Sequence, residues 1–105
     1  MDKSNKKQLI STLKNHEYAS CYLQDALGRS VEINEFSLFL TAIRSVVEAN
    51  GGMAVIAKKM QVGKESFYKS LQPDKKPRFA TIAKALKSCG IEIKFKPTKG
   101  NHDSV

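Results

Sequence analysis

Polar side chains are concentrated between Lys64 and Gln72, and their types suit hydrogen bonding to nucleic-acid bases. Lysine donates to guanine acceptors or to phosphate, glutamine pairs with adenine, and glutamate accepts from cytosine. Phe67 and Leu71 lie four residues apart, so both fall on one side of a helix and leave the polar residues on the other. The candidate base-contacting residues are Lys64, Glu65, Ser66, Tyr68, Lys69 and Gln72.

Two of these residues have an equally ordinary structural use. Glu65 near the start of a helix stabilises that helix by interacting with the positive end of its dipole, whether or not it contacts a base. Tyr68 is either a groove contact or a half-buried brace, and the sequence leaves both readings open.

Candidate phosphate contacts flank this segment on both sides. The backbone amides near Gly52 and Met53 begin a preceding helix, and the amides at a helix start suit a phosphate. Basic side chains nearby are better placed for phosphates than for bases. The candidate phosphate-contacting residues are Gly52, Met53, Lys58, Lys75, Lys76 and Arg78.

The positive charge of the chain is concentrated in the same half. The net charge is +8, and residues 52–99 carry twelve Lys and Arg against three Asp and Glu, whereas residues 1–51 carry six of each. A basic face favours a polyanionic partner by attraction and by release of condensed counterions. Charge alone does not separate this from a solvated lysine-rich surface.

Two short helices must position these residues. We expect them over 53–60 and 64–71, joined by a tight turn at Gln61–Gly63. Helices of this length are marginal in water, so tertiary packing must hold them. This is the helix-turn-helix arrangement, in which the first helix braces and the second is presented. The expected inward residues are Ile56, Ala57, Met60, Val62, Phe67 and Leu71.

The N-terminal part is predicted to hold a polar arm and two longer helices. Residues 1–15 read as a frayed or disordered arm with helix only near its end. A helix over 17–27 ends at Gly28, with 29–34 as a connection. The inward stripe of this helix is expected to be Tyr18, Cys21, Tyr22 and Ala26.

A second helix begins at Glu35, capped by Asn34, and stops at Asn50–Gly51. Its inward residues follow helical spacing: Phe36, Phe39, Leu40, Ile43, Val46 and Val47.

The C-terminal part is expected to contain a helix and then a strand. Phe79, Ile82, Ala83 and Leu86 indicate the helix, which ends at Cys89–Gly90. Residues 91–96 then alternate apolar and polar side chains, which predicts one strand. A lone strand leaves its backbone unpaired, so Ile91, Ile93 and Phe95 mark a segment that pairs with a second copy or a partner protein. The alternative is an irregular extended tail that packs its three apolar side chains on the helices.

Other classes of protein fit the sequence poorly. The two histidines, His16 and His102, lie in polar ends without an accompanying acid, and no nucleophilic or paired-carboxylate grouping is evident, so we do not expect an enzyme. Cys21 and Cys89 lack metal-ligand spacing and are expected to be reduced. We expect no metal, no cofactor and no membrane segment, and a cytoplasmic location.

Four segments of the chain carry a family resemblance: YLQDAL, FLTAIRSVVEANGGMAVIAKKM, ESFYKSL and FATIAKALKSCGIEIKFKP. Together, from about Tyr22 to Pro97, they resemble the addiction-module antidote family, small antitoxins with a Cro/lambda-repressor-type helix-turn-helix related to the HigA group. The most specific motifs are A-x-G-G-M-A at 49–54 and E-S-x-Y-[KR]-x-L at 65–71.

The resemblance implies an all-α fold, a five-helix lambda-repressor-like domain with a short C-terminal β-strand. It divides the chain into an arm (1–15), a domain (16–97, with the helix-turn-helix at about 53–72) and a flexible tail (98–105). It also implies a homodimer on double-stranded operator DNA, a cognate toxin of the RelE/HigB ribonuclease class, and repression of the shared operon. A stand-alone Cro-type transcriptional regulator without a toxin is the alternative function.

One position departs from the family pattern. The family usually has glycine in the turn where Gln61 stands, and this chain has Gly63 two residues later. A left-handed conformation costs a non-glycine residue about 1 kcal/mol, so we expect a rearranged turn, which shifts the register of the following helix by about one residue.

Overall fold

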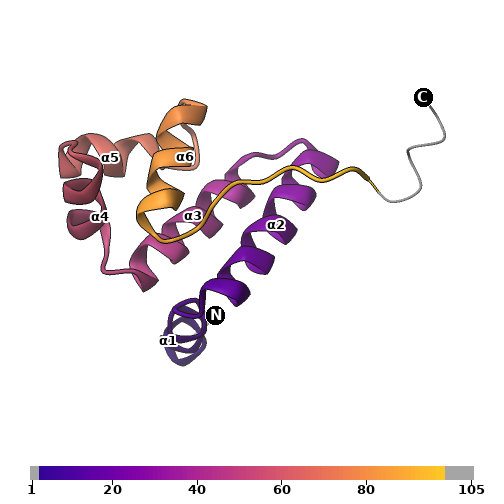
Figure 1. Cartoon of the computed structure of the whole chain (residues 1–105), viewed down its shortest axis with the longest axis horizontal. Coiled ribbons are helices and arrows are strands. Elements are labelled where there is room, and N and C mark those ends of the chain that lie inside the picture. The colour runs from indigo at the N-terminus through magenta and orange to yellow at the C-terminus, as the bar shows by residue number, and fades with distance from the viewer. Residues whose placement is uncertain (1–2, 99–105) are drawn as a thin grey trace.

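The computed structural model describes residues 3–98, and this part of the chain contains six helices. Figure 1 shows α2 and α3 side by side, with α4, α5 and α6 gathered near the C-terminal end of α3. The helices are α1 Lys3–Thr12, α2 His16–Ile33, α3 Ser37–Ala49, α4 Met53–Met60, α5 Lys64–Ser70 and α6 Phe79–Ser88. The all-α prediction is confirmed, but the expected five helices are six within this described range.

The central helix of the core is α3, which packs against α1, α2, α4 and α6. Its residues Leu40, Ile43, Val46 and Val47 are all fully buried, as the periodicity predicted. Phe36 was predicted inward but remains 39% exposed, with its ring 5.7 Å from that of Phe39. The prediction is wrong at this position because Phe36 only caps the helix and lies at the margin of the core.

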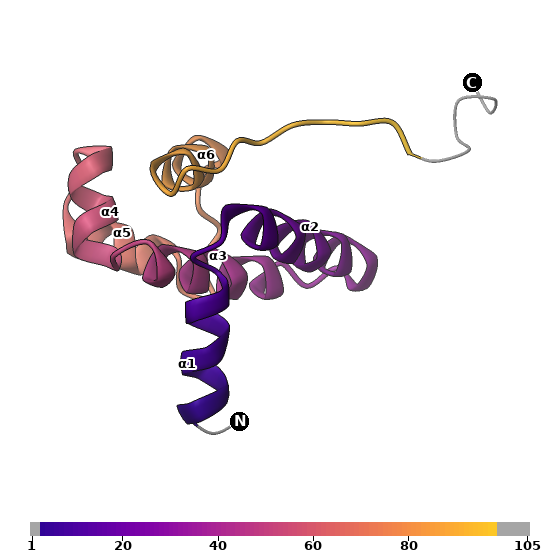
Figure 2. The ribbon, with the colours of Figure 1, turned by 60° about the horizontal axis from the view of Figure 1, so that its bottom comes forward.

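The predicted polar arm is largely helical. α1 begins at Lys3 and stands away from the rest of the molecule in Figure 2. Leu13, just beyond its end, is fully buried, and Leu9 and Ile10 pack against the core. These three apolar residues dock the segment, which a reading of local polarity did not predict.

The second helix is longer than predicted and turns a different face inward. α2 continues through Gly28 to Ile33, and Asn34 ends it in the left-handed conformation with φ 56° instead of capping α3. Its buried residues are Ala19, Leu23 and Ser30. Of the predicted stripe, Tyr18 and Cys21 are exposed, and Tyr22 and Ala26 are half-buried. Packing along α3 outweighs the cost of about 1 kcal/mol for a glycine inside a helix.

Ser30 explains how α3 begins. Its side chain is buried, and its Oγ accepts a hydrogen bond from the backbone N–H of Phe39 at 2.9 Å. This contact gives the buried hydroxyl a partner and gives the Phe39 amide, which also donates to the Phe36 carbonyl at 3.0 Å, a second acceptor at the start of α3. A residue placed inside the predicted connection therefore caps the next helix from a distance.

The two cysteines are free, as expected, and differ in environment. Cys21 is exposed, whereas Cys89 ends α6 inside the core. Burial raises the pKa of the Cys89 thiol to about 11, partly opposed by the positive charge of Lys59. Cys89 thus behaves as a small apolar core residue.

The predicted strand is absent from the described residues. Residues 91–98 form an irregular extended segment that leaves α6 and runs along the molecule (Figure 1). Ile91 is buried and Ile93 packs against the core, but Phe95 is 91% exposed. The irregular alternative is therefore correct for two of the three side chains. The predicted tail, 98–105, lies outside the described residues apart from Thr98.

No single helix of residues 3–98 is long and apolar enough to cross a bilayer. α3 and α4 reach that composition only together, as a pair bent by 93°. Their apolar residues, including Ile43 and Ile56, are buried in the core of this chain.

Candidate nucleic-acid interface

The turn between α4 and α5 keeps the predicted register. Gln61 ends α4 and adopts the left-handed conformation with φ 62° and ψ 42°. Its neighbour Val62 donates a backbone hydrogen bond to the Ala57 carbonyl at 3.0 Å, which closes the helix. Gly63 is extended, with φ −71° and ψ 140°, and begins α5. The expected rearrangement of the turn is therefore wrong: Gln61 itself takes the strained position.

α5 presents one polar face and buries the other. Phe67 is 2% exposed and Leu71 is fully buried, as predicted. Five candidate base-contacting residues lie at the surface: Lys64, Glu65, Ser66, Tyr68 and Lys69. The sixth, Gln72, is half-buried, and its amide donates to the Tyr68 carbonyl at 3.2 Å.

The bracing helix is less buried than predicted. Ile56 and Ala57 are buried and Met60 is half-buried, in agreement with the pattern. The prediction that Val62 points inward is wrong: it is 44% exposed and lies in the turn, directly after the left-handed Gln61.

Arg44 is a supporting residue that the sequence analysis missed. Its Nη1 donates to the Leu71 carbonyl at 2.6 Å, and its Nη2 donates to Thr41 Oγ1 at 3.4 Å. The first bond ties the central helix α3 to the residue that ends α5, and so fixes the angle at which α5 is presented. The contact spans 27 residues, so no local pattern indicates it.

A hollow of about 270 Å³ lies at the start of α4 and is lined by Arg44, Glu48, Gly52, Met53 and Tyr68. It brings two predicted phosphate contacts, Gly52 and Met53, next to one predicted base contact, Tyr68. The Arg44 guanidinium and the first amides of α4 are suited to an anion, whereas the exposed Glu48 carboxylate opposes one.

The other predicted phosphate contacts lie outside this hollow. Lys58 is exposed in the last turn of α4, where its positive charge also stabilises the helix by interacting with the negative end of the helix dipole. Lys75, Lys76 and Arg78 are exposed in the segment between α5 and α6. The structure therefore leaves all four free at the surface without gathering them into one site.

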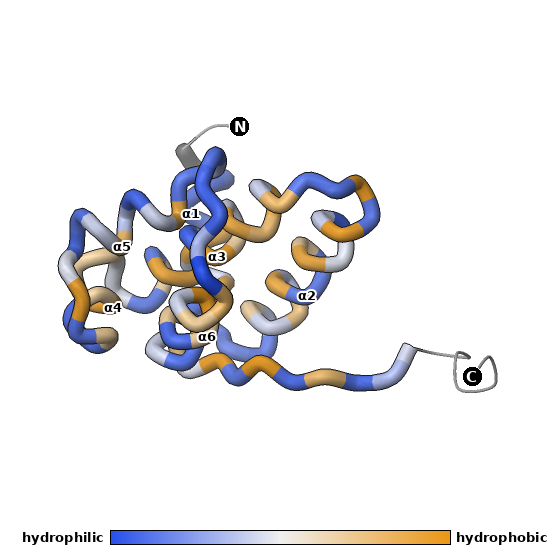
Figure 3. The backbone as a smooth tube through the Cα atoms, turned by 90° about the horizontal axis from the view of Figure 1, so that it is seen from above, coloured by the Kyte–Doolittle hydropathy of each residue, from blue (hydrophilic) through white to orange (hydrophobic). Residues whose placement is uncertain are grey.

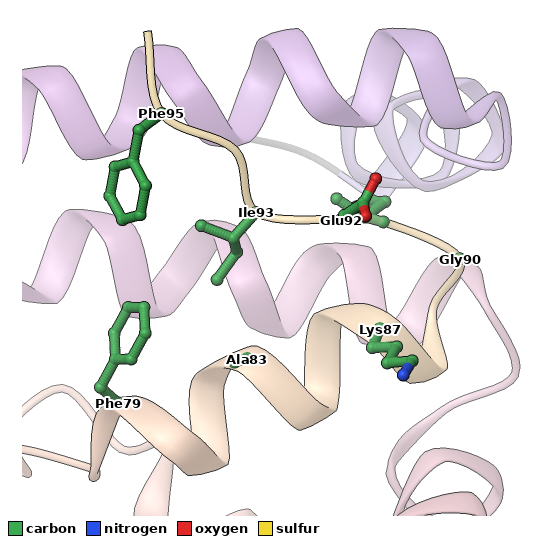
Figure 4. A pocket seen from close by; sticks show the side chains of 8 residues that line it. Phe79, Ala83, Lys87, Gly90, Glu92, Ile93 and Phe95 are labelled. Carbon is green, nitrogen blue, oxygen red and sulfur yellow. The ribbon is translucent and has the colours of Figure 1, made fainter.

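The extended segment after α6 is bordered by two apolar hollows. One, of about 450 Å³, lies between it and α6, and Figure 4 shows the rings of Phe79 and Phe95 directed toward each other there. The other, of about 600 Å³, includes Leu27 of α2 and Phe39 of α3. Ile91 N–H donates to the Leu86 carbonyl, but within the described part of the chain residues 92–98 make no backbone hydrogen bond.

Within residues 3–98, no group of three His, Cys, Asp or Glu side chains could hold a metal ion. His16 does not lie in an isolated polar end: it begins α2, with Nε2 3.3 Å from Asn50 Oδ1 at the end of α3. His102 lies outside the described residues.

A model of the family described as "probable addiction module antidote protein" matches residues 3–97. The match covers all six helices and nearly all of the described extended segment. No curated protein and no solved structure matches the chain significantly.

Proposed function

Because the chain belongs to the family of probable addiction module antidote proteins, we propose that it binds and neutralises a cognate RelE/HigB-like ribonuclease toxin and represses the operon that encodes both proteins. The antitoxin role follows from the family. The class of toxin, the DNA-binding activity and the autorepression are the proposed part. Neutralisation would be by occlusion of the toxin, with no chemistry performed by this chain.

The face of α5 supports the DNA-binding part most directly. Phe67 and Leu71 are buried, which leaves Lys64, Tyr68 and Lys69 at the surface. Seven residues make a helix roughly 10 Å long, and the major groove of B-DNA is about 12 Å wide. Glu65, Ser66 and Gln72 complete the proposed base-reading set.

Phosphate contacts would hold α5 in register on the duplex. The amides at Gly52 and Met53 and the side chains of Lys58, Lys75, Lys76 and Arg78 are proposed for this role. Such contacts supply affinity that does not depend on sequence and weakens with salt.

A homodimer would place two such helices on a palindromic operator, with half-sites about one helical turn apart. Pairing of residues 91–95 with the same segment of a second copy, antiparallel about Ile93, would satisfy the unpaired backbone. This register places Glu92 opposite Lys94 of the other copy, so opposite charges meet twice. It also groups Ile91, Ile93 and Phe95 on one face.

Paired substitutions on α5 test the DNA-binding part. Lys64→Ala with Lys69→Ala should weaken binding to the promoter of the chain's own operon by about tenfold or more in a gel shift at moderate salt. The free energy of unfolding should change by only a fraction of about 1 kcal/mol, since both side chains are exposed.

Lys84→Ala with Lys87→Ala on α6 is the matched control, since it removes the same charge from exposed positions elsewhere. This control should keep most of the promoter affinity. Equal losses in the two variants would mean that charge alone drives binding, and a wild-type chain that shifts no promoter DNA would refute the DNA-binding proposal.

Co-purification with the product of the adjacent reading frame tests the toxin part. The proposal requires a stable complex and loss of the partner's RNA-cleaving activity. Promoter binding without such a complex would favour the stand-alone regulator instead.

A further inference from the structure

The outer face of α2 combines acidic and exposed apolar side chains. The helix packs on α3 through Ala19, Leu23 and Ser30 and leaves its opposite side in solvent. The exposed acids on that side are Glu17, Asp25 and Glu32. At 3.6 residues per turn these three lie within an arc of about 80° on the helix.

Two apolar side chains border the acids. Leu27 is 40% exposed and Val31 is 74% exposed, and their spacing of four residues puts them on one edge of the same face. Figure 3 shows hydrophobic and hydrophilic residues alternating along α2. Glu17, Asp25, Leu27, Val31 and Glu32 are together called the α2 face.

The charge of the α2 face is opposite to that of the whole chain. α2 carries three acids and one arginine, in a protein of net charge +8. The arginine, Arg29, places its Nε 3.1 Å from Asp25 Oδ2, while no ion pair is found for Glu17 or Glu32 within residues 3–98. A surface of this kind repels nucleic acid and attracts a basic protein surface.

We propose that the cognate toxin docks on the α2 face through a basic surface that carries apolar side chains. The inference rests on the proposed function, because a ribonuclease must hold RNA phosphates with positive charge. In the complex, part of the toxin's positive surface that otherwise attracts RNA is covered by Glu17, Asp25 and Glu32. Leu27 and Val31 bury apolar area against the toxin.

Two observations select the toxin over a second copy of this chain. Two α2 faces brought together would place acids against acids, which opposes self-association. The face is also remote from α4 and α5, which lie at the other side of the molecule in Figure 1. A toxin bound there leaves the candidate nucleic-acid interface open.

Neutralising the acids tests the proposal with the full-length chain. Glu17→Gln, Asp25→Asn and Glu32→Gln together should raise the Kd for the protein encoded by the adjacent reading frame by roughly tenfold or more at low salt. The loss should shrink as salt rises, because exposed charges are screened. Calorimetric titration measures the Kd, and a gel shift on the operon's promoter should be undiminished.

A second triple variant is the matched control. Glu35→Gln, Glu48→Gln and Asp74→Asn remove the same number of exposed acids from outside α2 and should leave the Kd for the toxin unchanged. Leu27→Ala with Val31→Ala should also weaken the complex. Val55→Ala with Val62→Ala, which truncates two exposed valines in and just after α4 (43% and 44% exposed), should not.

The outcomes separate the inference from the proposed function. A wild-type complex that the α2 variants do not weaken would overturn docking on the α2 face while leaving the antitoxin role intact. If the α2 variants changed the mass of the toxin-free chain in light scattering, relative to the wild type, the α2 face would bind a second copy. That result would also overturn docking of the toxin on the α2 face. A wild-type chain that binds no toxin would overturn both proposals.

Discussion

Gln61 holds the backbone conformation on which the α4–α5 turn depends. Its φ of 62° lies in the left-handed region, which a residue with a Cβ occupies at a cost of about 1 kcal/mol. Gly63, two residues later, has a φ of −71° that any residue can adopt. The glycine of this turn therefore does not occupy its left-handed position, which is held by Gln61 instead.

Gln61→Gly should raise the free energy of unfolding by about 1 kcal/mol, because glycine removes the left-handed strain. Urea unfolding followed by circular dichroism measures the change. Gln61→Ala is the control: it shortens the side chain but keeps the Cβ, so it should give little or no gain. A loss of stability in the glycine variant would contradict the strain assigned to this residue.

At the scale of elements, α5 depends on packing more than on its own propensity. Its seven residues are too few for a stable isolated helix. Phe67 anchors it in the core, and Arg44 holds the Leu71 carbonyl at its end. The orientation of the exposed face of α5 therefore depends on these two contacts.

Phe67→Ala should lower the free energy of unfolding by about 3–5 kcal/mol, since it leaves a cavity under α5. Tyr68→Ala is the matched control, because it truncates the neighbouring aromatic residue, which is 51% exposed. That variant should cost about 1 kcal/mol or less. Urea or thermal unfolding measures both losses, and a larger loss for Tyr68→Ala than for Phe67→Ala would mean that the buried and exposed faces of α5 have been interchanged.

At the scale of the whole molecule, charge and position divide the surface into two regions. The excess of basic residues follows Gly52. Those of α4 and α5 lie across α3 from the acidic α2 face (Figure 1), whereas Lys94 and Lys96 line a hollow beside Leu27 of that face. DNA can therefore bind at α4 and α5 while the α2 face is occupied by another protein.

Promoter DNA, this chain and its toxin should accordingly form one complex. Light scattering after gel filtration should show one species whose mass is that of the promoter DNA, two copies of this chain and the bound toxin. The α2 triple variant should bind DNA without recruiting toxin. Displacement of the DNA by added toxin would mean instead that the two partners share a surface.

Features set by near neighbours in sequence were predictable. α4 has the expected bounds and α5 ends one residue early, because glycine and asparagine mark the breaks and Phe67 and Leu71 follow helical spacing. The burial of most of α3 and the side chains exposed on α5 follow from the same periodicity. Contact of those side chains with DNA stays a prediction.

Features set by distant contacts were decided only by the tertiary structure. α1 is docked by Leu13, and α2 continues past Gly28 because it packs on α3. Ser30 accepts a hydrogen bond from Phe39, nine residues away, and Arg44 reaches Leu71 across 27 residues. The alternation at 91–96 is a real period of two, but a strand needs a neighbouring strand to complete its hydrogen bonds, and residues 3–98 provide none. Local pattern therefore determines which face of a segment is apolar, whereas the length of a helix and the existence of a strand depend on what that face meets.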